Sequence, residues 1–137
     1  MDDLEEFLTS IVNAKRKLKM IYYTGRNSDQ RNDAKELIAF LIELGTKADR
    51  LVQITSESPI ARKLMSDRKA ELELHRWSQG LLNRTSDYVS KAKDLSYEHA
   101  HRYQLVMMEY LETIESELSK WIEEIETATG VPRPPKD

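Results

Sequence analysis

The sequence predicts an all-α protein folded as an antiparallel four-helix bundle in up-down-up-down order. Apolar residues recur at alternating steps of three and four through long segments, which places them along one face of an α-helix. Only four glycines and four prolines interrupt the chain, and no long alternation of apolar and polar residues indicates a strand. At 137 residues, the chain has the usual length of one domain.

The first helix is predicted from Asp2 to Thr24. Its apolar stripe consists of Leu4, Phe7, Ile11, Ala14, Leu18 and Ile21. Acidic residues fill the first turn and lysines gather in the second half, an arrangement that complements the helix dipole. Gly25 is expected to stop this helix by adopting the left-handed conformation.

The second helix is predicted from Asp29 to Thr55, with Asn27 or Ser28 as its N-cap. Its apolar stripe consists of Ala34, Leu37, Leu41, Leu44, Ala48 and Leu51. Further isoleucines widen this stripe, so we expect the second helix to be the most buried of the set.

The third helix is predicted from Pro59 to Lys93, because Ser58 is a good N-cap and proline fits the first helical position. Its apolar stripe is thinner than those of the first two helices. Gly80 and the polar run that follows it weaken the middle of the pattern and indicate a kink there.

The fourth helix is predicted to start after Ser96 as its N-cap and to run to Thr129, where Gly130 ends it. The last two helices are longer than the first two, so we expect them to form a long hairpin that projects beyond the bundle. Residues 1–130 are therefore assigned to one helical domain and residues 131–137 to a proline-rich flexible tail. A coiled-coil dimer is the competing architecture.

Composition narrows the classes of function. The chain has no cysteine, which excludes disulfides and thiolate zinc sites, and its net charge of −3 does not favour general nucleic-acid binding. It has no apolar run near the ~18 residues of a membrane span, and the acidic first residues are unlike a secretory signal. We therefore expect a soluble, cytoplasmic protein without a membrane partner.

Arg68 and His75, separated by six residues, form the sharpest candidate for catalysis. Their spacing resembles the arginine–histidine motif of the HEPN superfamily, all-α domains of similar size that include metal-independent ribonucleases. Lys69 departs from that motif, which usually has a small polar or acidic residue after the arginine. The resemblance implies RNA cleavage by Arg68 and His75. Without it, the two side chains are expected to pair with carboxylates such as Glu115 or to lie in water.

The spacing of histidines and glutamates gives little indication of a metal or cofactor site. Glu98 and His101 have the Glu-x-x-His spacing of carboxylate-bridged di-iron bundles, but such sites need a second pair and two further inward glutamates. His75 and His99 lack a glutamate three residues before them. We therefore predict neither a metal nor a cofactor.

Charge is unevenly distributed along the predicted bundle. If the helices alternate in direction, residues 14–41 and 78–112 gather at one end, where eleven lysines and arginines face eight carboxylates for a net charge of +3. The candidates there for binding an anion or an acidic partner are Lys19, Arg26, Arg31, Lys91, Lys93 and Arg102. The alternative is that these cations only complement the dipoles of their own helices.

The sequence as a whole favours a non-enzymatic helical-bundle module that acts by contact with another protein or with a copy of itself. This interpretation depends on the long amphipathic, charge-rich helices and on the lack of a catalytic constellation. A HEPN-like ribonuclease or nucleic-acid-binding protein that uses Arg68 and His75 is the alternative.

Overall fold

The computed structural model describes residues 2–68 and 70–130, and this part of the chain contains five helices and no strand. The helices are α1 (Asp2–Thr24), α2 (Ser28–Glu57), α3 (Pro59–Asp67), α4 (Ala70–Asp94) and α5 (Tyr97–Thr129). The all-α prediction is confirmed. The proline-rich tail predicted at residues 131–137 lies outside the described residues.

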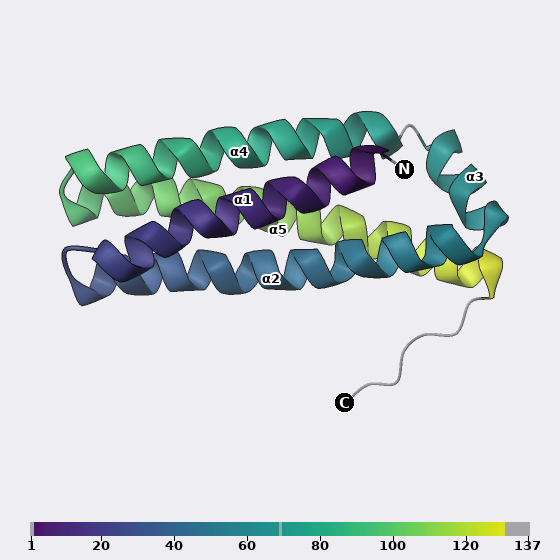
Figure 1. Cartoon of the computed structure of the whole chain (residues 1–137), viewed down its shortest axis with the longest axis horizontal. Helices are drawn as coiled ribbons and strands as arrows, with labels where there is room; N and C mark the ends of the chain where they lie inside the picture. Colours follow the sequence, from purple (N-terminus) through teal and green to yellow (C-terminus); the bar gives the residue numbers. More distant parts are fainter. Residues whose placement is uncertain (1, 69, 131–137) are drawn as a thin grey trace.

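Four long helices lie side by side as two hairpins, α1–α2 and α4–α5, stacked on each other (Figure 1). Glu6 contacts His75 and Lys17 contacts Ser86, so α1 and α4 run in the same direction. The Asp33–His101 and Lys47–Glu115 pairs show the same parallel relation between α2 and α5. The α1–α2 turn and the α4–α5 turn therefore lie at the same end of the molecule (Figure 1).

The two hairpins bury corresponding positions about 70 residues apart. Leu4 and Leu74 are both buried, as are Leu41 and Leu111, and α1 and α4 end at Thr24 and Asp94. Seventy residues are ten heptads, so residues 70 apart occupy equivalent positions when the apolar stripes of both hairpins have the same heptad period. Two hairpins with corresponding apolar faces can pack against each other, with α1 on α4 and α2 on α5.

The predicted third helix is wrong in one respect: it is interrupted at Arg68, the C-cap of α3, and forms two helices, α3 and α4. Met65 and Ala70 are both buried, although side chains five residues apart do not lie on one face of a straight helix. α3 instead crosses the end of the molecule and contacts α2, α4 and α5.

The prediction that the last two helices project beyond the other helices is also wrong. α5 is the longest helix, but its C-terminal part packs beside α2 and α3, where Glu126 pairs with Arg50 and Glu124 with Arg68. Its extra length is covered by the neighbouring helices.

Most of the predicted helix ends are confirmed. The side chain of Asn27 accepts a hydrogen bond from the Gln30 amide at the start of α2. Ser58 accepts one from the Ala61 amide ahead of α3, and Gly130 ends α5 in the left-handed region with φ of 68°. Local side-chain chemistry is therefore enough to fix these ends.

Two other predicted helix ends differ in detail. Gly25 follows α1 without a positive φ; a Cβ there would lie 2.7 Å from the carbonyl oxygen of Ile21 and 2.8 Å from Cγ of Arg31. Glycine is thus needed for close approach. Ser96 precedes α5 but makes no capping hydrogen bond, because its hydroxyl contacts Nδ1 of His99 at 2.8 Å.

The core contains the whole predicted stripes of α1 and α2 and most of those of α4 and α5. The apolar stripes predicted for the third and fourth helices also include Ile60, Leu72 and Ala128, which are exposed. Trp77 of α4 stacks on Trp121 of α5 at 4.8 Å between ring centroids. No helix in the described residues is long and apolar enough to span a membrane.

Candidate partner-binding groove on α4 and α5

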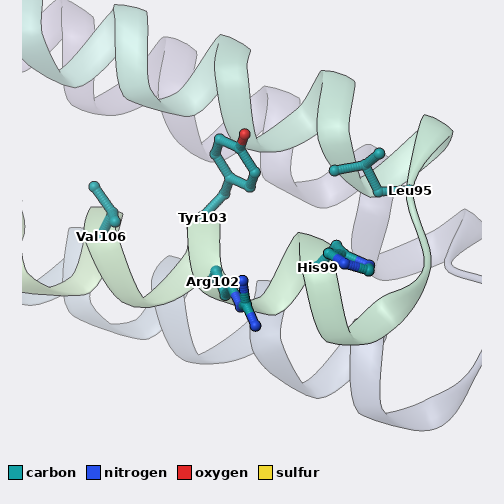
Figure 2. A pocket seen from close by; sticks show the side chains of 5 residues that line it. All are labelled: Leu95, His99, Arg102, Tyr103 and Val106. Atoms are coloured by element: carbon teal, nitrogen blue, oxygen red, sulfur yellow. The ribbon is translucent and has the colours of Figure 1, made fainter.

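The outer side of α4 and α5 carries a hollow of about 280 Å³ near the turn that joins them. It is lined by Leu95, His99, Arg102, Tyr103 and Val106 (Figure 2). Tyr103 reaches from α5 toward α4, and its ring forms part of an apolar floor with the two aliphatic side chains (Figure 2). The floor is apolar, and histidine and arginine stand at its rim.

A second hollow continues along α5 from the first. It has a volume of about 250 Å³ and is lined by Arg84, Val106, Glu109, Tyr110 and Thr113. Val106 belongs to both hollows and is 55% exposed. We call the two hollows together the α4–α5 groove.

Two cations of α4 lie over two tyrosines of α5 along this groove. The guanidinium carbon of Arg84 is 3.8 Å from the ring centroid of Tyr110, and Nζ of Lys91 is 5.6 Å from that of Tyr103. The cations are seven residues apart on α4, and the tyrosines are seven apart on α5. Both pairs therefore face the same side, two helical turns apart.

Gly80 makes room for one of these pairs and does not kink the helix as the sequence predicted. α4 runs unbroken through this position. A Cβ here would lie only 2.1 Å from the hydroxyl oxygen of Tyr110 and 3.1 Å from a guanidinium nitrogen of Arg84. The glycine thus leaves room for the hydroxyl end of the Tyr110 ring beside α4.

The cations predicted for anion binding divide into two groups, and the first serves the fold. Arg26 donates hydrogen bonds to the carbonyl oxygens of Ala92 at 2.7 Å and Leu95 at 2.5 Å, at the end of α4. Arg31 donates to the carbonyl oxygen of Gly25 at 3.0 Å. Both arginines satisfy carbonyls at helix ends, the dipole-complementing role.

The second group lies free for contact at the same end. Lys19, Lys93 and Arg102 are exposed, and none of them has an ion pair within the described part of the chain. Lys91 is held over Tyr103. The α1–α2 and α4–α5 turns lie at the same end of the molecule, so the cations near these turns are at one end, as the charge prediction requires (Figure 1). Of the six candidates, Lys91 and Arg102 adjoin the groove.

A partly buried polar cluster lies where α2 contacts α5. The carboxylate of Asp33 is 2.6 Å from Nδ1 of His101, and the Tyr97 ring packs on the imidazole. Tyr88 of α4 is almost wholly buried nearby. Burial, followed by the charge of Asp33, raises the pKa of the Tyr88 hydroxyl far above its ordinary value.

This shift predicts a loss of stability in alkali. Above about pH 10 the unfolded chain releases the Tyr88 proton while the folded chain keeps it, so the free energy of unfolding falls by up to ~1.4 kcal/mol per pH unit. Urea denaturation at pH 8 to 11 measures this slope. Tyr88→Phe is expected to reduce it, and an unchanged slope in that variant would contradict the assignment.

Arg68 and His75, the candidates for catalysis, pair with carboxylates of different helices. Arg68 pairs with Glu124 of α5, and Nδ1 of His75 lies 3.1 Å from Glu6 of α1. The partners differ from Glu115, which pairs with Lys47. These contacts do not test RNA cleavage, so the ribonuclease hypothesis stays a prediction.

Two sets of side chains have the residue types of metal ligands. His101 of the Glu-x-x-His pair turns its Nδ1 to Asp33 and Tyr97. Ligand atoms of Asp3, Glu6 and His75 lie within 4.8 Å of one another near the start of α1. Exposed acidic groups commonly gather in this way without a metal.

Several groove residues were missed by sequence reasoning. The apolar period of the predicted fourth helix places Tyr103 and Tyr110 on its inward stripe, but both are half-buried and line the groove. The available signal was the matching seven-residue spacing of Arg84 with Lys91 and of Tyr103 with Tyr110. Its use required knowledge that α4 and α5 run antiparallel and in this register.

Comparison of the chain with models of known protein families, with curated proteins and with solved structures finds no match. The function is therefore argued from the geometry of the groove and from the charges around it.

Proposed function

We propose that this chain is a protein-interaction module that binds another protein, or a second copy of itself, through the α4–α5 groove. The proposal assigns no reaction to the chain. One observation carries it: Val106, an aliphatic side chain 55% exposed, stands in a continuous hollow that has an apolar floor of Leu95 and Tyr103. Exposed apolar surface bordered by polar residues is typical of protein contacts.

The surroundings of the groove support the same proposal. Tyrosine and arginine, which are enriched where proteins bind each other, also line the groove as Tyr103, Tyr110 and Arg102.

The proposal includes the bundle architecture predicted from the sequence. We take the four long helices to act as one rigid up-down-up-down unit, closed at one end by α3. The contacts of α1 with α2 and α4, and of α5 with α2 and α4, support this interpretation. A rigid unit keeps the groove preformed, which lowers the entropic cost of binding.

A site-specific photo-cross-linker tests the proposal. It is placed at Val106 or at Leu105, which are neighbours on α5 with similar exposures of 55% and 52%, and only Val106 lines the groove. In cells that contain the chain naturally, irradiation is expected to give protein adducts mainly from the Val106 position. Light scattering of the purified protein separates binding to a second copy from binding to another protein.

Equal yields of adducts from the two positions would mean that the groove has no special role. A monomeric protein without adducts at Val106 would make the proposed function wrong.

A further inference from the structure

We infer that the α4–α5 groove receives an acidic amphipathic helix of a partner protein, with two carboxylates seven residues apart and an aliphatic residue between them. This inference rests on the proposed function and names the chemistry of its partner. It depends on the positions of Arg84 and Lys91 and on Val106, the exposed aliphatic side chain that lines both hollows between the two tyrosines.

The size of the groove fits a helix. On α5 the lining runs from His99 to Thr113, which are fourteen positions apart and therefore about 21 Å apart along the helix, or about four helical turns. The walls are helices whose backbone groups are already paired, so they offer no edge to an extended peptide. A helical occupant satisfies its own backbone hydrogen bonds and can bury one face.

The charges along the groove select an acidic occupant. Arg84 and Lys91 stand seven residues apart, about 10.5 Å along α4, and no ion pair engages either of them in the described residues. Arg102 adds a third cation at the rim, where Glu109 is the one carboxylate among the residues that line the two hollows. An occupant with carboxylates at the same 10.5 Å spacing can meet both α4 cations.

The aromatic residues fix these cations in place. Tyr110 holds the Arg84 guanidinium at 3.8 Å, and Gly80 allows that ring to lie against α4. Tyr103 holds Lys91 in the corresponding way. Side chains restrained before binding lose less entropy on contact, and the guanidinium keeps free N–H donors for a carboxylate.

A nucleic acid is a less suitable occupant of the same surface. Each tyrosine already carries a cation over one face, which competes with the stacking of a base, and Glu109 repels a phosphate backbone beside Tyr110. We therefore make nucleic-acid binding an outcome of the test.

Selection from a displayed library of 16-residue helical peptides, with the residues of one face randomised, tests the inference on the full chain. We expect selected peptides to carry aspartate or glutamate at positions i and i+7 around an aliphatic residue. A synthetic peptide of this type, labelled for fluorescence anisotropy, is expected to bind R84Q/K91Q about tenfold more weakly, since two exposed ion pairs are lost. Its affinity is expected to fall with added salt.

The matched control is R62Q/K63Q, which removes the same two charges from exposed positions on α3. It is expected to bind the peptide like the parent protein. Gly80→Ala displaces Tyr110, which holds Arg84, but leaves both charges present, and it is expected to weaken binding by a smaller factor.

Three results would overturn the inference: a selection that yields neutral or basic helices or none, equal binding by R84Q/K91Q and the parent, or tighter binding of a single-stranded oligonucleotide than of the peptide. If cross-links at Val106 persist in that event, the groove still binds a protein and only the acidic chemistry is wrong. If they are absent too, the proposed function fails as well.

Discussion

Replacing Trp77 with alanine is expected to lower the free energy of unfolding by about 3–5 kcal/mol, a large part of the stability of a domain of this size. Trp77 is almost wholly buried, stacks on Trp121 of α5 and lies 5.9 Å from Phe7 of α1 by ring centroids. Its removal leaves a cavity where three helices meet. Urea denaturation followed by far-ultraviolet circular dichroism measures the loss.

Leu105→Ala is the control for this prediction, because Leu105 is a large apolar residue that is 52% exposed. We expect a change within about 0.5 kcal/mol for this variant. Equal effects of the two substitutions would show that the interface of Phe7, Trp77 and Trp121 does not hold the helices together.

Replacing Glu126 with alanine is expected to cost about 3 kcal/mol of unfolding free energy, since it removes the carboxylate that pairs with the largely buried guanidinium of Arg50. Arg50 and Glu126 have side-chain exposures of 13% and 8%, and their nearest charged atoms are 3.0 Å apart. They join α2 to the C-terminal part of α5. Chemical denaturation of the variant measures the cost.

Glu124→Ala offers a close comparison two positions earlier on α5. Glu124 also pairs with an arginine, Arg68, but its side chain is 52% exposed. Because water screens an exposed pair, we expect a cost of at most about 1 kcal/mol. The double variant R50M/E126L, which removes both buried charges, is expected to recover most of the stability lost in Glu126→Ala. A similar cost for Glu124→Ala and Glu126→Ala would contradict this explanation.

Much of the helical structure is predictable from local sequence. The stripes from Leu4 to Ile21 and from Ala34 to Leu51 are buried as predicted, because a helix with one apolar face has one way to remove it from water. The starts of α2 and α3 at Asn27 and Ser58 are also local, since a side chain three residues away satisfies a free amide.

The break at Arg68 and the role of Gly80 are not local properties. A glycine in a helical pattern is compatible with a kink or with a close neighbour, and only the position of Tyr110 decides between these two. The polar residues around Arg68 are equally compatible with an exposed helix turn. The break there follows from the need of the chain to cross from α2 to α4 over the end of the molecule.

The candidate groove depends even more on tertiary structure. Arg26 and Arg31 have the same charge as Arg102 and lie at the same end of the molecule. Hydrogen bonds to the carbonyls of Ala92, Leu95 and Gly25 occupy the first two, while Arg102 remains at the rim of the groove. Sequence position alone does not distinguish a capping arginine from one that can meet a partner.

The sequence by itself determined that the chain is helical, where most helices begin and end, and which face of α1 and α2 is buried. Those features follow from the 3.6-residue period and from hydrogen bonds within a few residues. Only the tertiary structure decided that α1 is a neighbour of α4 and that Arg84 and Lys91 of α4 lie over Tyr110 and Tyr103 of α5. Helices whose apolar stripes have the same period can pack in several arrangements. Side-chain packing between segments far apart in the sequence decides which arrangement forms.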